Sequence, residues 1–247
     1  MTTDFFKYKY GYEIEGIWLP RVTAITSLIS RSFSFAGAGA AADWGTKVHA
    51  AVERIMKNEY AGGFEDIAPS VRAFEKWRTD HGVKPAGRAN AVEARVWDFE
   101  HGYAGTLDLV AEVQGRVGVV DVKTASVMRE EYALQTAAYM GAYNLGAPGK
   151  EKAETRWILR IDQYRECRGC MARKKDKDKK GRAQGGNEQC NHQWGEAVGA
   201  AEFLEFPDFL QDFNAFLAAK EVWEWYHRGI LRGISNYPKN VVQKVLV

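Results

Sequence analysis

Cysteine, long apolar runs and an N-terminal targeting segment are scarce or missing in this 247-residue sequence. The three cysteines are odd in number and unevenly spaced, which argues against a disulfide framework. No apolar run approaches the roughly 20 residues that are needed to span a bilayer. The opening residues, MTTDFFKYKYGYEIEG, lack the apolar centre of a signal peptide. We therefore expect a cytoplasmic protein that has no membrane partner.

Aromatic residues are plentiful by contrast, with 8 Trp, 11 Tyr and 12 Phe in a chain that is 46% hydrophobic. This composition favours a globular protein, and the length suits one domain over residues 1–247, with or without an insertion. The net charge is only +2, but residues 165–190 hold nine Lys or Arg against four Asp or Glu. A nucleic-acid partner is compatible with this uneven charge, which does not by itself establish one.

Hydrophobic periodicity and turn residues predict helices and strands along the whole chain. The expected elements are an N-terminal hairpin, a short helix after Pro20, a helix from about Asp43, a helix ended by Gly82, three strands over 90–124, a helix ended by Gly146, a strand over 155–164, a polar segment, a strand over 200–206 and a long final helix. This order predicts an α/β fold with a central sheet.

The most informative stretch is VGVVDVKTAS, residues 117–126, where an apolar strand abruptly carries charges. Residues i and i+2 of a strand share a face, so Asp121 and Lys123 point to one side while Val120 and Val122 point into the core. Charges on a core strand are unfavourable unless they are paired or bind a metal. We therefore expect the charged side to face outward and to carry a function.

The preceding strand, AGTLDLVAEV, supplies a second carboxylate. A two-residue turn at Gln114–Gly115 would pair Val113 with Arg116 and bring Asp108 opposite Asp121. A longer loop of even length would shift the partner to Lys123, and an odd length would break the inference. Two carboxylates this close require a positive charge between them, which Lys123 or a divalent cation such as Mg²⁺ could supply.

The spacing of these three residues leaves two interpretations open. A cation held by two carboxylates lowers the pKa of a coordinated water and clamps a phosphodiester, and an adjacent ammonium offsets charge on phosphorus. The alternative is a structural ion triad of Asp108, Lys123 and Asp121 on a half-exposed sheet face.

Four short motifs, taken in their order along the chain, resemble those of a known family, and this resemblance favours the metal site over the ion triad. GTKVHAAVE, GTLD, DVK and QTAAY resemble the Gly-x-x-x-His, Gly-x-x-Asp, Asp-x-Lys and Gln-x-x-x-Tyr motifs of the PD-(D/E)XK nuclease superfamily. The likeness is greatest to its RecB-like branch, which includes Cas4-type and phage-type exonucleases, and it covers roughly residues 10–165. It implies a restriction-endonuclease-like core, with a central mixed sheet flanked by helices, in an intracellular protein encoded by a bacterium or a phage.

The resemblance also implies roles for individual residues. Asp108, Asp121 and Lys123 would be catalytic, and Mg²⁺ or Mn²⁺ would be held by His49, Asp108, Asp121 and the backbone carbonyl of Val122. Glu93 resembles a further acidic residue of the branch, although a surface glutamate would look the same. Gln135, Tyr139 and Thr124 would contact DNA or substrate. For these three residues, ordinary packing, solvent exposure or the end of a strand remain alternative explanations.

The polar segment over residues 165–195 contains a second group of ligand-type side chains. Cys167, Cys170, Cys190 and His192 form a C-x2-C-x19-C-x-H pattern that suits a structural Zn²⁺, with unmetallated thiols as the alternative. Because no cysteine precedes Cys167, a four-cysteine iron–sulfur cluster within one chain is excluded. The basic run 173–182 could be a solvated loop or a finger that contacts phosphates.

The function expected from these features is that of a metal-dependent DNA nuclease. The resemblance favours an exonuclease that acts in recombination, repair or phage DNA processing, with a recombination or replication protein as a further candidate partner. The alternative is a catalytically silent nuclease fold that binds DNA or a protein. Cleavage polarity, strand preference, a choice between DNA and RNA, and the oligomeric state do not follow from the sequence.

Overall fold

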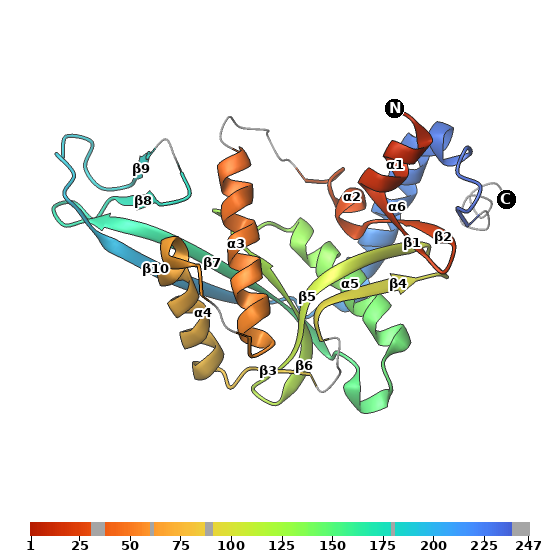
Figure 1. Ribbon diagram of the computed structural model, residues 1–247, viewed down its shortest axis with the longest axis horizontal. Coiled ribbons are helices and arrows are strands. Elements are labelled where there is room, and N and C mark those ends of the chain that lie inside the picture. The colour runs from red at the N-terminus through yellow and green to blue at the C-terminus, as the bar shows by residue number, and fades with distance from the viewer. Residues whose placement is uncertain (31–37, 60–61, 87–90, 179–180, 239–247) are drawn as a thin grey trace.

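A computed structural model describes residues 1–30, 38–59, 62–86, 91–178 and 181–238 of the chain. A mixed β-sheet lies at its centre, and helices cover both faces (Figure 1). The α/β class and the central mixed sheet predicted from the sequence are therefore confirmed. Within the described residues, no helix combines the length and apolar character that crossing a bilayer requires.

The sheet is built on five long strands. In spatial order they are β4 (Val92–Asp98), β5 (Tyr103–Val113), β6 (Arg116–Lys123), β7 (Thr155–Cys167) and β10 (Trp194–Glu205). The first three form the expected antiparallel meander, and β7 pairs with β10 in antiparallel fashion. Strands β6 and β7 are parallel, because helix α5 (Glu131–Gly146) carries the chain back across the sheet between them.

The hairpin between β5 and β6 has the predicted register. Val113 pairs with Arg116 around the turn of Gln114 and Gly115, both of which have positive φ angles. The paired residues continue to Leu109 and Val120, one position short of Asp108 and Asp121. The two carboxylates therefore lie where the ladder between the strands ends.

Helices pack on the two faces of the sheet in different groups. On one face, α3 (Ala38–Met56) and α4 (Ala68–Asp80) bury Val48, Val52, Phe74 and Trp77 against β5, β6 and β7. The other face packs against α5 and α6 (Phe209–Leu231), together with α1 (Thr3–Tyr10) and α2 (Val22–Thr26). The short helices η1 (Glu65–Ile67) and η2 (Gly149–Glu151) complete the connections.

Two N-terminal predictions need correction. The aromatic residues before Gly11 belong to α1, which the Thr2 hydroxyl caps by accepting a hydrogen bond from the Phe5 amide, and the hairpin of β1 (Gly11–Ile14) and β2 (Ile17–Pro20) begins only at Gly11. Helix α3 begins at Ala38 rather than near Asp43. The alanine-rich stretch before Asp43 was expected to be a loop, but alanine is the strongest helix former.

The polar segment is an extension of the sheet. Strands β7 and β10 continue past the neighbouring strands, and the chain between them, residues 168–193, adds β8 (Arg173–Lys175) and β9 (Ala183–Gln184). We call residues 168–193 the arm. Figure 1 shows the arm at one end of the molecule, with α1, α2 and α6 at the opposite end. Strand β3 (Lys84–Pro85) forms a short pairing with Ala111 and Glu112, near the C-terminal end of β5.

Candidate active site

The predicted catalytic residues meet where β5 and β6 part. Asp108 directs its Oδ2 atom to the backbone N–H of Val122, which donates a hydrogen bond of 2.7 Å. Its Oδ1 atom lies 3.2 Å from Nδ1 of His49 on α3. The structure thus brings residues of two other elements, β6 and α3, to one carboxylate of β5. The proposed ligand role of the Val122 carbonyl stays a prediction.

Asp121 lies on the face that α5 covers. Its Oδ1 atom accepts a hydrogen bond of 3.0 Å from Nε2 of Gln135, and its Oδ2 atom contacts the ammonium of Lys123. Asp121 is only 1% exposed, so the expectation that the charged side faces outward is wrong. The physical reason is the parallel β6–β7 pair, whose crossover helix must pack on this face of the sheet.

Glu93 joins the site through an unusual backbone conformation. Its φ angle is +52°, and it interrupts the β4–β5 pairing between Val92 and Ala94. A positive φ is strained for a residue with a Cβ atom, and such strain is often retained at functional sites. One oxygen of Glu93, one nitrogen of His49 and one oxygen of Asp108 lie within 4.8 Å of one another.

Burial and neighbouring charges change how these groups titrate. Burial, followed by the charge of Asp108, raises the pKa of Glu93 to about 7. Burial also raises the pKa of Asp121 to about 6, although Lys123 opposes the rise. Asp108 is buried too, but His49, Lys123 and the Val122 amide hold its pKa below the ordinary value. Against the effect of burial, Asp108 raises the pKa of His49. Three carboxylates share two nearby cationic groups, His49 and Lys123, so the ionised forms are not all stabilised equally.

The donor atoms of this site suit a hard divalent cation. Oδ2 of Asp121 is buried and meets the Lys123 ammonium as an ion pair, but it receives no hydrogen bond of normal geometry. A buried carboxylate oxygen that lacks a hydrogen bond is unfavourable in a finished structure. Carboxylate oxygens are the ligands that Mg²⁺ prefers, and an imidazole beside them is better matched to Mn²⁺. The side chains of His49, Glu93 and Asp108, whose donor atoms lie together, therefore fit such an ion. Asp121 is not a member of that group of three, and its role as a ligand stays a prediction.

Gln135 and Tyr139 support the site from α5. Besides its bond to Asp121, Nε2 of Gln135 donates to the Tyr139 hydroxyl at 3.2 Å. Tyr139 is only 2% exposed, which favours a supporting role over the direct DNA contact that the resemblance implied.

Thr124 is partly exposed, and a Cβ atom at Gly45 would come within 3.1 Å of its Oγ1 atom. The glycine of the GTKVH motif thus lets α3 approach the end of β6.

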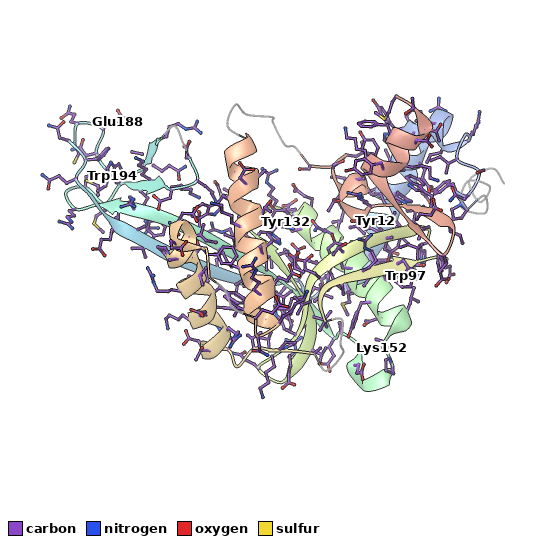
Figure 2. The ribbon with its side chains drawn as sticks, viewed as in Figure 1. Tyr12, Trp97, Tyr132, Lys152, Glu188 and Trp194 are labelled. Carbon is purple, nitrogen blue, oxygen red and sulfur yellow. The ribbon has the colours of Figure 1, made fainter. Side chains whose placement is uncertain are left out.

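Sequence reasoning missed Tyr132 as a member of this site. The Lys123 ammonium lies 5.0 Å from the centre of the Tyr132 ring, within the range of a cation–π contact. Tyr132, which is labelled in Figure 2, belongs to α5. Tyr132 precedes Gln135 by three residues and Tyr139 by seven, which places all three on one helical face. That spacing was the available signal.

A second group of ligand-type side chains lies at the base of the arm. Sγ of Cys170 is 3.3 Å from Nδ1 of His192, and the sulfur atoms of Cys167 and Cys190 are 3.8 Å apart without forming a disulfide. One ligand atom from each of the four residues lies within 4.8 Å of the others. The Gly169 amide donates to the Cys167 sulfur at 3.4 Å. This geometry suits a metal ion.

The basic run 173–182 is largely neutralised by acidic neighbours. Arg173 pairs with Glu166 at 3.1 Å, and Arg182 pairs with Asp178 at 3.1 Å. Lys175 and Lys177 both pair with one residue of β7, Asp162, at 2.6 and 3.0 Å. The sequence alone is compatible with either a solvated loop or a phosphate-contacting finger. In the described part of the run, most cations instead have partners within the protein. Lys179 and Lys180 lie outside the described residues.

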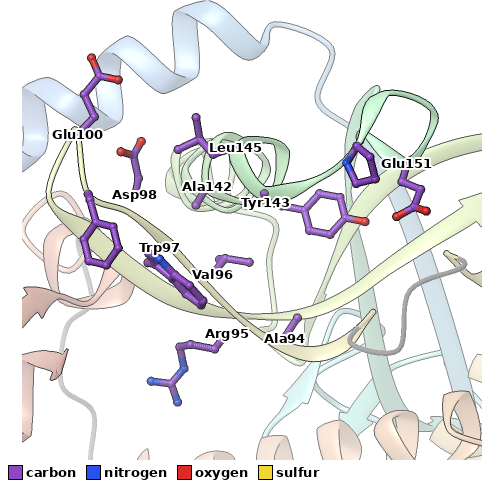
Figure 3. Close-up of a pocket in the computed structure, with 13 residues that line it drawn as sticks. Ala94, Arg95, Val96, Trp97, Asp98, Glu100, Ala142, Tyr143, Leu145 and Glu151 are labelled. Carbon is purple, nitrogen blue, oxygen red and sulfur yellow. The ribbon is translucent and has the colours of Figure 1, made fainter. Parts of the chain in front are cut away.

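A pocket of about 910 Å³ lies apart from this chemistry, between β4 and the C-terminal end of α5 (Figure 3). It is lined by Val96, Trp97, Tyr143 and Leu145, among others. None of the residues assigned above to the candidate active site lines it. We therefore assign it no part in the site.

Comparison with known families is consistent with this geometry. A sequence model of the PD-(D/E)XK nuclease superfamily matches residues 30–219, which include every candidate site residue named above. No curated protein matches the chain.

Proposed function

Because the chain belongs to the PD-(D/E)XK nuclease superfamily, we propose that it is a divalent-metal-dependent deoxyribonuclease. The observation that carries the proposal is the meeting of the buried Asp121 with the partly buried Asp108 and Lys123 at the end of the β5–β6 ladder. His49 reaches this point from α3 and Gln135 reaches it from α5. A purely structural ion triad would not need two further elements aimed at the same carboxylates.

We assign the ligand set to His49, Asp108 and Asp121, with Glu93 as a fourth member. Mg²⁺ or Mn²⁺ bound there would polarise the phosphodiester and stabilise the leaving oxygen. The protein's own contribution is to hold the carboxylates still: the Val122 amide fixes Asp108, and Gln135 fixes Asp121. Positioning of this kind supplies much of the rate in phosphoryl transfer.

Lys123 is proposed as the catalytic lysine. Its side chain is 17% exposed, so the ammonium can face both Asp121 and a substrate phosphate. The charge of Asp121 keeps the pKa of Lys123 above its ordinary value in spite of burial. The group is therefore cationic at neutral pH, as required to offset charge that develops on phosphorus. Thr124, which follows it, is proposed to contact the substrate.

DNA as the substrate and an exonuclease mode are proposed from the likeness to RecB-like nucleases. That likeness also points to recombination, repair or phage DNA processing, with a recombination or replication protein as partner. The test is to incubate the protein with linear and circular DNA, in single- and double-stranded forms, with Mg²⁺ or Mn²⁺. Degradation of linear DNA alone would mark an exonuclease.

Two variants with side chains of similar size test whether DNA cleavage comes from this site or from a contaminating nuclease. Asp121→Asn and Lys123→Met should each reduce cleavage by about a hundredfold or more. Lys76→Met is the matched control, since Lys76 forms an exposed pair with Asp80 on α4. Cleavage that survives in both site variants would refute the proposal. DNA binding without cleavage in the wild-type protein would favour the alternative, a silent nuclease fold.

We further propose that the arm holds one structural Zn²⁺ through Cys167, Cys170, Cys190 and His192. Three thiolates and an imidazole form a usual tetrahedral zinc set. The arm buries little apolar surface of its own, and a metal would supply folding free energy that a small core cannot.

A further inference from the structure

The loop that follows the catalytic lysine is held by three cationic side chains. The backbone carbonyl of Thr124 accepts a hydrogen bond from Lys177. The next carbonyl, of Ala125, lies 3.5 Å from Nη1 of Arg160, and that of Ser126 lies 3.4 Å from Nζ of Lys175. Three consecutive carbonyls directly after Lys123 are thus each given a charged donor.

All three donors share one buried carboxylate. Asp162 on β7 has a side chain that is 5% exposed, and it pairs with Arg160, Lys175 and Lys177 at 3.1, 2.6 and 3.0 Å. We call these four residues the Asp162 clamp. Glu202 on β10 adds a second acidic contact to Arg160 at 2.6 Å. Removing the Asp162 carboxylate would leave the charges of three cationic side chains uncompensated, so disrupting this arrangement is unfavourable.

The sheet explains why a clamp is needed at this point. Strand β6 ends at Lys123, whose partner on the parallel strand is Arg160, whereas β7 continues for seven more residues. Beyond Lys123 the loop has no strand partner on β7, so its carbonyls need other donors. Asp162 follows Arg160 by two residues and therefore lies on the same side of β7.

Two of the clamp residues come from the arm. Lys175 is the last residue of β8, and Lys177 follows it by two positions. Asp176, between them, accepts hydrogen bonds from Gln163 and Arg165 of β7 at 2.8 and 3.2 Å. The side chain of Lys177 is only 7% exposed. This burial argues against a free phosphate-contacting lysine.

We propose that the arm is a positioning device for the catalytic lysine, acting through the Asp162 clamp. Lys177 and Lys175 are positioning residues: they fix the loop 124–126, and the loop fixes the end of β6 that carries Lys123. The inference rests on the proposed nuclease function for its kinetic readout alone. Its structural part, an ordered loop that depends on the arm, stands independently.

The test compares Lys177→Met with Lys174→Met. Both changes remove one positive charge from the arm, but Lys174 takes no part in the Asp162 clamp. With saturating metal and a varied DNA concentration, Lys177→Met should lower kcat by about tenfold and leave KM within about twofold, because Lys123 is displaced rather than the substrate. Lys174→Met should change neither parameter. Lys177→Arg, which keeps a cationic donor, should restore part of the activity.

Hydrogen exchange of the segment 124–130 supplies the second readout. Lys177→Met should speed exchange there by about tenfold while the melting temperature confirms a folded protein. Unchanged kcat with unchanged exchange would overturn the proposal. An equal rise of KM in both methionine variants would also overturn it and assign the arm to phosphate contact. If the wild-type protein cuts no DNA, the nuclease proposal fails, and the exchange result alone decides the clamp.

Discussion

Gly105 and Tyr139 lie so close that a Cβ atom at Gly105 would stand 2.4 Å from Cε1 of the Tyr139 ring. The two residues belong to separate motifs, one in β5 and one in α5. The glycine of the GTLD motif therefore makes room for the tyrosine of QTAAY. Since Gln135 donates hydrogen bonds to both the Tyr139 hydroxyl and Asp121, this contact affects the position of the carboxylate that we propose to be catalytic.

Gly105→Ala should lower the free energy of unfolding by about 2 kcal/mol, because overpacking forces the ring or the strand to move. Gly229→Ala is the control: nothing lies within 4 Å of a Cβ at this exposed helical position, so alanine should be neutral or slightly stabilising. In a Tyr139→Leu background, the Gly105→Ala change should cost clearly less. Urea denaturation measures the wild-type protein and these four variants, and equal effects of Gly105→Ala in both backgrounds would contradict the contact.

Gln135→Leu should reduce kcat/KM by about tenfold and weaken metal binding. The substitution removes the donor that holds Oδ1 of Asp121, leaving this carboxylate less well oriented. Gln211→Leu, at an exposed position of α6, provides a matched change outside the site. Kinetics and calorimetric titration with Mn²⁺ would check the effect. Unaltered affinity and rate in the Gln135 variant would remove this residue from the site.

The metal-free protein should lose stability as pH rises from about 4 to about 7. Asp121 and Glu93 have folded-state pKa values of about 6 and about 7, above the ordinary values of 3.8 and 4.5. Between these limits the folded state holds more protons than the unfolded chain, so raising the pH favours unfolding. The raised pKa of His49 acts in the same direction. Asp108, with a lowered pKa, contributes only below about pH 4.

The expected difference in melting temperature is about 5 °C between pH 5 and pH 8 in buffer without added Mg²⁺ or Mn²⁺. Mg²⁺ or Mn²⁺ should recover it at pH 8, since the cation neutralises the carboxylates. Asp121→Asn should reduce the difference, whereas Asp80→Asn, which alters an exposed pair with Lys76, should not. A melting temperature that responds identically in both variants would show that Asp121 is not the source.

Elemental analysis of the purified protein should find one zinc per chain. Cys190→Ser should lower this content, and Asn191→Ala, a change at the exposed neighbouring residue, should leave it unchanged. Because Lys175 and Lys177 lie between the two halves of the ligand set, zinc loss should also speed hydrogen exchange over 124–130. Iron in place of zinc, or a full metal content in Cys190→Ser, would refute the assignment.

Much of the active-site hairpin could be predicted because its constraints are local. The turn at Gln114–Gly115 fixes the register, and the two-residue period of a strand places Asp121 and Lys123 on one side. The burial of that side could not be predicted, because it depends on where a crossover helix packs. The positive φ of Glu93 was equally hidden, since a glutamate in an apparent strand gives no sign of a strained backbone.

The family, the α/β order of elements and the residue types that can hold a metal could all be predicted from the sequence, because short motifs and periodicities record them directly. Three relationships are visible only in the folded chain: Gln135 reaches Asp121, Gly105 leaves space for Tyr139, and Lys175 and Lys177 reach the loop after Lys123. The physical reason is separation along the chain. A buried charge can pair with any group that the fold brings near it, and the local sequence pattern does not identify that group.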